Sequence, residues 1–186
     1  AEQISLSYGQ PWHLPGRGFM LIQNRYTDGR AVAFQTSADG RTWSEPRLLA
    51  QFKGHYQISA PSPDNRRVAV VFNYHPRGLD TRTNLYYLET DDFGRTWRSV
   101  DGVAIPTPLV DVKNAGLVHD YESEGLLVYL KDVQFDAAGC PVLVYLTSRH
   151  HMPGAVHGPH TWWTARWDGK AWLRRPITIS DHNYDF

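Results

Sequence analysis

The stretch Thr90-Asp91-Asp92-Phe93-Gly94-Arg95-Thr96-Trp97 decides the fold, because related stretches occur at two other places in the chain. One is Ser37-Ala38-Asp39-Gly40-Arg41-Thr42-Trp43, and a weaker one is Trp167-Asp168-Gly169-Lys170-Ala171-Trp172. The hydroxyl and carboxylate of such a stretch can bind backbone N–H groups of a tight turn, and the Gly supplies a left-handed residue. The last tryptophans of the three stretches are 54 and 75 residues apart. A turn unit that recurs at such intervals indicates a repeat architecture, with an insertion in the longer interval.

Short apolar runs lie between these turns. Each run has four or five residues, is rich in β-branched and aromatic side chains, and is bounded by turn-forming residues. No apolar stripe with helical spacing extends over ten or more residues. The sequence therefore predicts an all-β fold of many short antiparallel strands. The runs are Phe19–Ile22, Ala31–Phe34, Val68–Phe72, Leu85–Leu88, Leu126–Tyr129 and Val142–Tyr145.

The pattern Thr90-x-Asp92-x-Gly94-x-Thr96-Trp97 resembles the Asp box, or BNR repeat, of sialidase-like β-propellers. The first copy lacks one residue between Asp39 and Gly40, and the third copy lacks both the hydroxyl residue and the Asp spacing. The resemblance implies a β-propeller of four-stranded antiparallel blades, with about three blades present. It implies little about activity, because Asp boxes occur in hydrolases, lyases and binding proteins.

The strand count divides this single propeller region, residues 1–186, into approximate blades at 1–50, 51–110 and 111–180. Residues 181–186 are expected to start a further blade. Propellers typically close with four to eight blades, because an open blade edge is exposed to mispairing. We therefore expect either further blades outside this sequence or self-association of two copies.

The composition excludes several classes of partner. Lys and Arg number 19 and Asp and Glu number 19, so the formal net charge is zero. Binding to nucleic acid or to an anionic membrane surface requires a net basic surface. No run of 18 or more apolar residues is present, which argues against membrane insertion. A single cysteine, Cys140, excludes an intramolecular disulfide framework.

Polar side chains recur at one rim of the expected propeller. Within a blade, strands A to D run outward from the axis, and the Asp box joins strands C and D. The opposite rim therefore carries the start of A, the end of B and the start of C. Cationic, imidazole and phenol groups recur at these positions, as expected for a ligand site on a rigid scaffold. Strand A would start near Gly54, Tyr129 and Asp181, strand B would end near Tyr26, Pro76 and His151, and strand C would start near Arg30, Arg82 and His160.

The pair His55 and His75 falls at the start of A and the end of B in one blade. Imidazole changes charge between pH 5 and 8 and can therefore give or take a proton. The order Gly54-His55-Tyr56, Asn73-Tyr74-His75-Pro76 and Arg82-Thr83-Asn84 is similar to BNR-repeat polysaccharide lyases that act on uronic-acid glycans, such as the ulvan lyases. This resemblance implies cleavage of an acidic polysaccharide by β-elimination, with two histidines in the funnel of the propeller.

β-Elimination needs a cation to neutralise the uronate carboxylate, a base to remove the C5 proton and an acid for the leaving oxygen. Arg82 or Arg149 suits the first task, since a guanidinium binds a carboxylate through two parallel hydrogen bonds. His55 or His75 suits the base, and a tyrosine suits the acid or an alternate base; Tyr56, Tyr121 and Tyr184 are the candidates. The remaining candidate substrate-binding residues are Gln57, Asn84, Lys131, Asp132, His160, His182 and Asn183.

Two other classes of function use similar residues. A sialidase-like glycoside hydrolase would need three arginines, for which Arg25, Arg82 and Arg149 are available, but no Arg-Ile-Pro segment precedes the first turn. A hydrolase with two carboxylates would depend on Asp132 and a second acid such as Asp181 or Asp185. A non-catalytic glycan-binding propeller would use the same arginines and aromatic side chains without turnover.

No cofactor is predicted. His150, His151, His157 and His160 are dense enough to bind zinc, but they flank an irregular loop without helical spacing, so a metal site is not predicted. No glycine-rich phosphate loop is present. The substrate class alone suggests a secreted or periplasmic protein.

Overall fold

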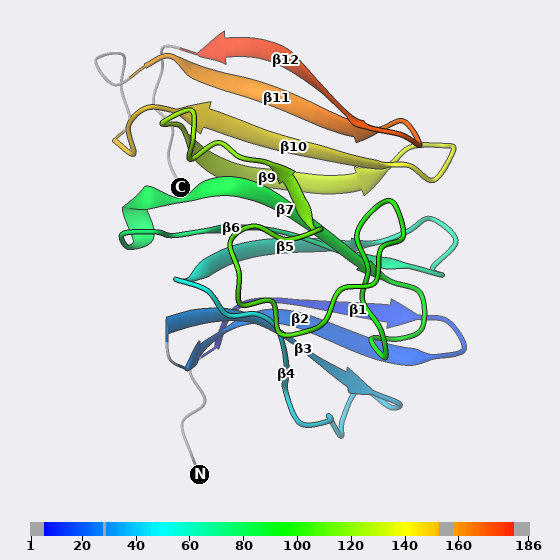
Figure 1. Cartoon of the computed structure of the whole chain (residues 1–186). Coiled ribbons are helices and arrows are strands. Elements are labelled where there is room, and N and C mark those ends of the chain that lie inside the picture. The colour runs from blue at the N-terminus through cyan, green and yellow to red at the C-terminus, as the bar shows by residue number, and fades with distance from the viewer. Residues whose placement is uncertain (1–5, 28, 153–157, 181–186) are drawn as a thin grey trace.

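The computed structural model describes residues 6–27, 29–152 and 158–180 and shows an all-β protein of three four-stranded antiparallel sheets. The predicted fold class and the number of blades are confirmed. In Figure 1 the sheets stack one above the other, with the first at the bottom and the third at the top. The first sheet contains β1 (Leu6–Leu14), β2 (Gly18–Thr27), β3 (Gly29–Ser37) and β4 (Arg47–Ala50). The second contains β5 (His55–Pro61), β6 (Val68–Tyr74), β7 (Thr83–Thr90) and β8 (Leu117–His119), and the third contains β9 (Leu127–Phe135), β10 (Pro141–Ser148), β11 (His160–Trp167) and β12 (Trp172–Ser180).

One blade boundary differs from the prediction. Residues 117–119 form β8, which pairs with β7 as the outer strand of the second sheet, so this blade extends beyond residue 110. The reason is the long connection between β7 and β8, which delays the fourth strand. The segment 181–186, expected to start a further blade, lies outside the described residues. Apart from the short η1 (Leu79–Thr81), the described part of the chain contains no helix, and no helix in it is long and apolar enough to cross a bilayer.

The turn between β3 and β4 has the hydrogen bonding that its sequence predicts. The Asp39 carboxylate accepts the backbone N–H groups of Arg41 and Thr42 at 2.8 and 2.9 Å, and the Ser37 hydroxyl accepts that of Gly40 at 2.8 Å. The turn after β7 repeats this arrangement: Asp92 accepts the N–H of Thr96 and Thr90 that of Gly94, both at 2.9 Å. The side chains thus fix the turns at the outer strands.

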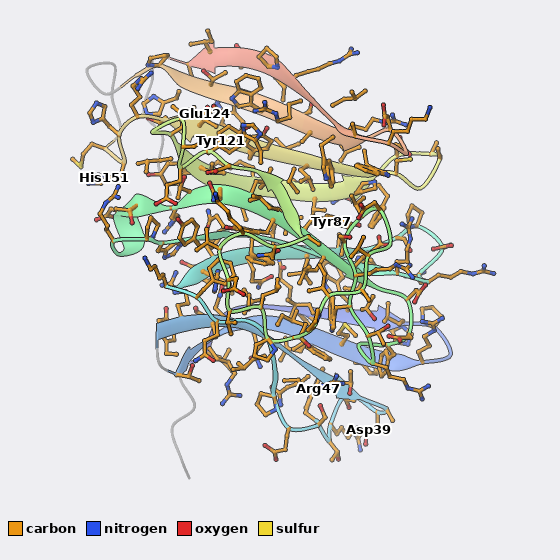
Figure 2. All side chains as sticks on the ribbon, viewed as in Figure 1. Asp39, Arg47, Tyr87, Tyr121, Glu124 and His151 are labelled. Atoms are coloured by element: carbon orange, nitrogen blue, oxygen red, sulfur yellow. The ribbon has the colours of Figure 1, made fainter. Side chains whose placement is uncertain are left out.

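The core lies between the sheets. Phe34 and Ile22 of the first sheet face Phe72 and Tyr86 of the second, where the last two rings stack at 5.0 Å. A second cluster joins the second and third sheets and includes Tyr87, which is labelled in Figure 2. Its ring meets that of Trp172 edge-on at 5.5 Å. Strand β5 contacts β1 on one side and β9 on the other. These three strands therefore form the inner edge of the stack, as strand A does in a propeller.

The connection between β7 and β8 also closes an edge of the first sheet. Leu109 pairs with Ala50 in parallel: its N–H donates to Leu49 and its carbonyl accepts the N–H of Gln51, both at 2.8 Å. An outer strand with unpaired backbone groups invites pairing with other chains. The second sheet therefore covers part of the exposed edge of β4.

Candidate functional site

The strand ends that carry the expected site residues meet at one rim of the stack. His55 at the start of β5 pairs with Tyr74 at the end of β6, and Tyr74 pairs with Thr83 at the start of β7. In the third sheet, Leu127 at the start of β9 pairs with Ser148 at the end of β10. This rim lies at the left of Figure 1, where η1 precedes β7. The label of His151 in Figure 2 marks the same side, away from the Asp39 turn.

His55 is a core residue in this structure. It is 0% exposed, its Nδ1 lies 3.0 Å from the carbonyl oxygen of Asn73, and its Nε2 accepts the N–H of Phe52 at 3.0 Å. Its ring packs edge-on against Phe52 and Phe72. Burial lowers the pKa of His55 to about 4, so the ring is neutral. The expectation that His55 acts as a base is therefore corrected, because both ring nitrogens are already hydrogen-bonded to backbone groups of Phe52 and Asn73.

His75 differs from His55 in one decisive respect. It is 3% exposed, and its Nε2 is buried without a hydrogen-bond partner among the described residues. Burial, together with the positive charges of Arg82 and Arg30, lowers the pKa of His75 to about 3. The imidazole is thus uncharged, and its Nε2 accepts no hydrogen bond from the described residues.

Arg82 joins the second and third sheets at this rim. Its guanidinium lies 5.3 Å from the ring centre of Tyr56 and 5.6 Å from that of Tyr129, within cation–π range of both. Burial raises the pKa of Tyr56, and it raises that of Tyr129 to about 12, so both phenols are protonated near neutral pH. Burial and the charge of Arg82 lower the pKa of Lys131, whose Nζ lies 5.6 Å from the ring of Trp162.

Two further residues complete this arrangement from the first sheet. The ring of Tyr8 meets Tyr56 edge-on at 4.7 Å and also faces the guanidinium of Arg30 at 5.6 Å. The sequence predicts Arg30 at a strand start, but neither Arg30 nor Tyr8 is among the predicted site residues. A recurrence of Arg near the starts of β3 and β7 was the signal that could have identified Arg30. We name the combined set the rim cluster: Tyr8, Arg30, Tyr56, His75, Arg82, Tyr129 and Lys131.

Several predicted substrate-binding residues serve the scaffold instead. Gln57 is buried and donates through Nε2 to the carbonyl oxygen of Tyr8 at 2.8 Å. Asn84 is buried, and its Oδ1 accepts the N–H of Glu122 at 2.8 Å. The assignments of Gln57 and Asn84 are corrected, because these side chains use their polar atoms to hold the backbone of neighbouring segments. His160 is buried at the start of β11, and its role in binding stays a prediction.

Other candidates are not members of the rim cluster or lie outside the described residues. Asp132 is exposed, and its carboxylate accepts the N–H of Val133 and the side-chain N–H of Gln134 on its own strand. Arg149 is exposed and lines a cavity of about 120 Å³ that Pro76 and Thr83, the residues after His75 and Arg82, also line. The roles expected for Asp132 and Arg149 stay predictions. Tyr184, His182 and Asn183 lie outside the described residues.

Tyr121, an alternative candidate acid, is buried between the second and third sheets. Its hydroxyl lies 2.6 Å from that of Tyr145 and accepts Nη1 of Arg174 at 3.2 Å. Figure 2 labels Tyr121 beside Glu124, near the end of β8. This contact ties two blades together. As for metals, no three His, Cys, Asp or Glu side chains gather as ligands within residues 6–27, 29–152 and 158–180.

Stacked four-stranded blades with a cationic, tyrosine-rich inner rim define a propeller-type protein with a site suited to an anionic ligand. The chain belongs to the BNR repeat-containing family, whose sequence profile matches residues 17–180. No curated protein sequence matches the chain.

Solved structures of polysaccharide lyases share the fold. An ulvan lyase of polysaccharide lyase family PL25 matches with a TM-score of 0.76 and 18% identity, over 91% of this chain and 43% of that one. The same enzyme bound to -[GlcA(1-4)Rha3S]- matches equally well. Polysaccharide lyase Uly1 matches with a TM-score of 0.72 and 14% identity, over 92% of this chain and 40% of that one. The resemblance expected from the sequence is confirmed, and the chain spans less than half the length of these structures.

Proposed function

We propose that the protein binds an acidic polysaccharide at the rim cluster and cleaves uronate-containing chains by β-elimination. The observation that carries this proposal is an uncharged His75, with Nε2 unpartnered, in the field of the Arg82 and Arg30 guanidinium groups. Such a site holds an anion and moves a proton beside it. The solved neighbour bound to -[GlcA(1-4)Rha3S]- supports the ligand class. For this class of substrate we also propose a secreted or periplasmic location.

In the proposed reaction, the uronate carboxylate binds Arg82, with Lys131 adding positive charge nearby. A guanidinium suits this task because it presents two parallel donors to a carboxylate. Neutralising the carboxylate makes the C5 proton more acidic. The cluster is thus arranged to stabilise the charge that develops when this proton leaves.

The proton is then removed by Nε2 of His75, a C4=C5 double bond forms, and the C4–O bond breaks. Tyr56, protonated at neutral pH, gives its proton to the departing oxygen. In the unliganded protein the neighbouring guanidinium groups disfavour protonation of His75. A bound carboxylate offsets their charge and so raises the pKa of His75 toward its usual range. Because His75 is 3% exposed, productive binding requires the side chains above it to move.

The test follows the ultraviolet absorbance of the unsaturated product during incubation with a panel of uronate polysaccharides. We expect absorbance to grow for the parent protein and for a His13→Ala control, whose histidine is exposed at the opposite end of β1. His75→Ala should lower the rate by about 10²–10⁴-fold, the usual contribution of a positioned acid or base. Release of reducing ends without this absorbance would indicate hydrolysis, and binding without either signal would indicate a glycan-binding propeller; both outcomes contradict the proposed reaction.

A further inference from the structure

Arg30 is held in a built aromatic site on the first sheet. Its guanidinium lies 5.2 Å from the ring centre of Tyr26 and 5.6 Å from that of Tyr8. Its Nη2 donates to the Tyr26 hydroxyl at 2.8 Å. Two rings and one hydrogen bond therefore fix the plane of the guanidinium before any ligand arrives.

The remaining nitrogens of Arg30 lack acceptors. Both Nε and Nη1 are buried, and neither has a hydrogen-bond partner among the described residues. Arginine does not lose its charge inside proteins, so burial cannot be relieved by deprotonation. A buried donor without a partner is destabilising, and an oxyanion is the ligand that best satisfies several guanidinium donors at once.

The backbone at Tyr8 supports the same interpretation. Tyr8 has φ of 53°, in the left-handed region that residues other than Gly, Asn and Asp rarely adopt. The buried side chain of Gln57 donates to the Tyr8 carbonyl at 2.8 Å and so helps to hold this conformation. Strained backbone persists where the surroundings impose it, commonly at binding sites. Here it accompanies the ring of Tyr8 between Arg30 and Tyr56.

A continuous row of tyrosine rings and arginines connects this site to the proposed catalytic centre. Arg30 faces Tyr8, Tyr8 meets Tyr56, and Tyr56 faces Arg82, with each step between 4.7 and 5.6 Å. The row then continues from Arg82 to Tyr129 on the third sheet. Both guanidinium groups act on the same His75, so they belong to one electrostatic environment.

We infer that Arg30, between Tyr8 and Tyr26, is a second anion subsite that binds an oxyanion on a sugar next to the one held at Arg82. This inference rests on the proposed function and deepens it. The preferred ligand is a glycan whose neighbouring sugars both carry a carboxylate or a sulfate. Tyr8 and Tyr56 lie between the two guanidinium groups and offer apolar ring surface to the sugar that joins the anions.

The test measures binding by titration calorimetry and turnover by ultraviolet absorbance for three sets of uronate oligomers. In one set uronates alternate with neutral sugars, in the second every sugar carries a carboxylate, and in the third uronates alternate with sulfated sugars. Arg30→Gln should weaken binding of the second or third set by about tenfold and leave the first within about twofold. The set that responds identifies the anion. Arg41→Gln, which removes an exposed charge at the other rim, should change none of them.

Two further variants keep the result interpretable. Arg30→Lys keeps the charge without the planar fork and should show a smaller loss than Arg30→Gln. Tyr26→Phe keeps the ring and removes the hydroxyl acceptor, so it tests the site if Arg30→Gln proves unstable on heating; it should weaken binding of the same set. Equal losses for all three sets, or no loss in any, would overturn the subsite. Selective binding without turnover would instead reject only the proposed lyase reaction.

Discussion

At the scale of single residues, the two histidines that look equivalent in the sequence play opposite parts in the structure. His55 has both ring nitrogens bound to backbone groups, whereas His75 keeps Nε2 unpartnered beside two arginines. Sequence patterns predicted that both lie at the inner rim of one blade. They could not predict which ring turns into the core, because that depends on Phe52 and Asn73 contacts specific to the folded chain.

The same limit explains why Tyr8 was missed. Its role depends on a left-handed backbone at a non-glycine residue and on a ring contact with Tyr56 in another sheet. Neither feature leaves a signal in local composition. By contrast, the position of Arg82 just before β7 followed directly from counting back from the turn at Asp92.

The two buried histidines should make the protein less stable in mild acid. Their pKa values in the folded state, about 4 for His55 and about 3 for His75, lie below the usual 6.5. The unfolded chain therefore binds more protons between pH 6.5 and 4, so the free energy of unfolding falls as the pH falls through this range. The shift of His55 alone corresponds to about 3 kcal/mol.

Urea unfolding at several pH values between 7 and 4 measures this effect. His55→Gln should flatten the dependence on pH, although it lowers stability at pH 7, because the contact with the Phe52 N–H changes. His13→Gln at an exposed position is the matched control and should keep the slope of the parent protein. An unchanged slope in His55→Gln would contradict the prediction.

At the scale of elements, turn chemistry was the most informative part of the sequence. The stretches around Asp39 and Asp92 fold as hydrogen-bonded turns after β3 and β7. The second blade was expected to end at residue 110, but its fourth strand begins at Leu117, because a long connection that pairs with the first sheet follows the Asp92 turn. Pairing between Leu109 and the first sheet is a long-range contact that no local pattern encodes.

Gly94 is the turn residue most sensitive to substitution. Its φ is 80°, and an added Cβ would meet the ring of Phe34, which packs against Trp97. Gly94→Ala should therefore combine the cost of a left-handed residue, roughly 1–2 kcal/mol, with overpacking of about 1–3 kcal/mol. Thermal unfolding of the variant measures the sum.

Gly169→Ala supplies the control for that comparison. Gly169 also has a left-handed backbone, with φ of 96°, but an added Cβ meets nothing within 4 Å. Gly169→Ala should lose only the stability that a left-handed alanine costs, without overpacking. Its melting temperature should therefore lie between those of the parent protein and Gly94→Ala. Equal losses in both variants would show that the contact with Phe34 carries no penalty.

At the scale of the whole molecule, three blades leave apolar side chains on the last strand exposed. Leu173, Ile177 and Ile179 of β12 are 41%, 56% and 67% exposed. The fold class and blade number could be predicted because each blade repeats the same turn and strand pattern. What covers β12 could not, since it depends on surfaces beyond this repeat. The expectation that further blades or a second copy complete a ring stays a prediction.

We expect the 186-residue chain to self-associate through this uncovered strand. Mass measured by light scattering over a range of concentrations should exceed that of a monomer at the upper end. Replacing both Ile177 and Ile179 by Thr keeps β-branched side chains and reduces apolar area, so it should shift the distribution toward monomer. A chain that stays monomeric at every concentration would contradict self-association.

The pairing of Leu109 with the edge of β4 has a consequence for how the protein opens. The segment around Leu109 must detach before β4, the outer strand of the first blade, can unfold locally. The two blades are therefore expected to open as one cooperative unit. In hydrogen exchange, the amide protons of Gln51 and Leu109, which form the two hydrogen bonds of this pairing, should show matching protection. If Leu109 exchanges rapidly while Gln51 stays protected, the two blades open independently.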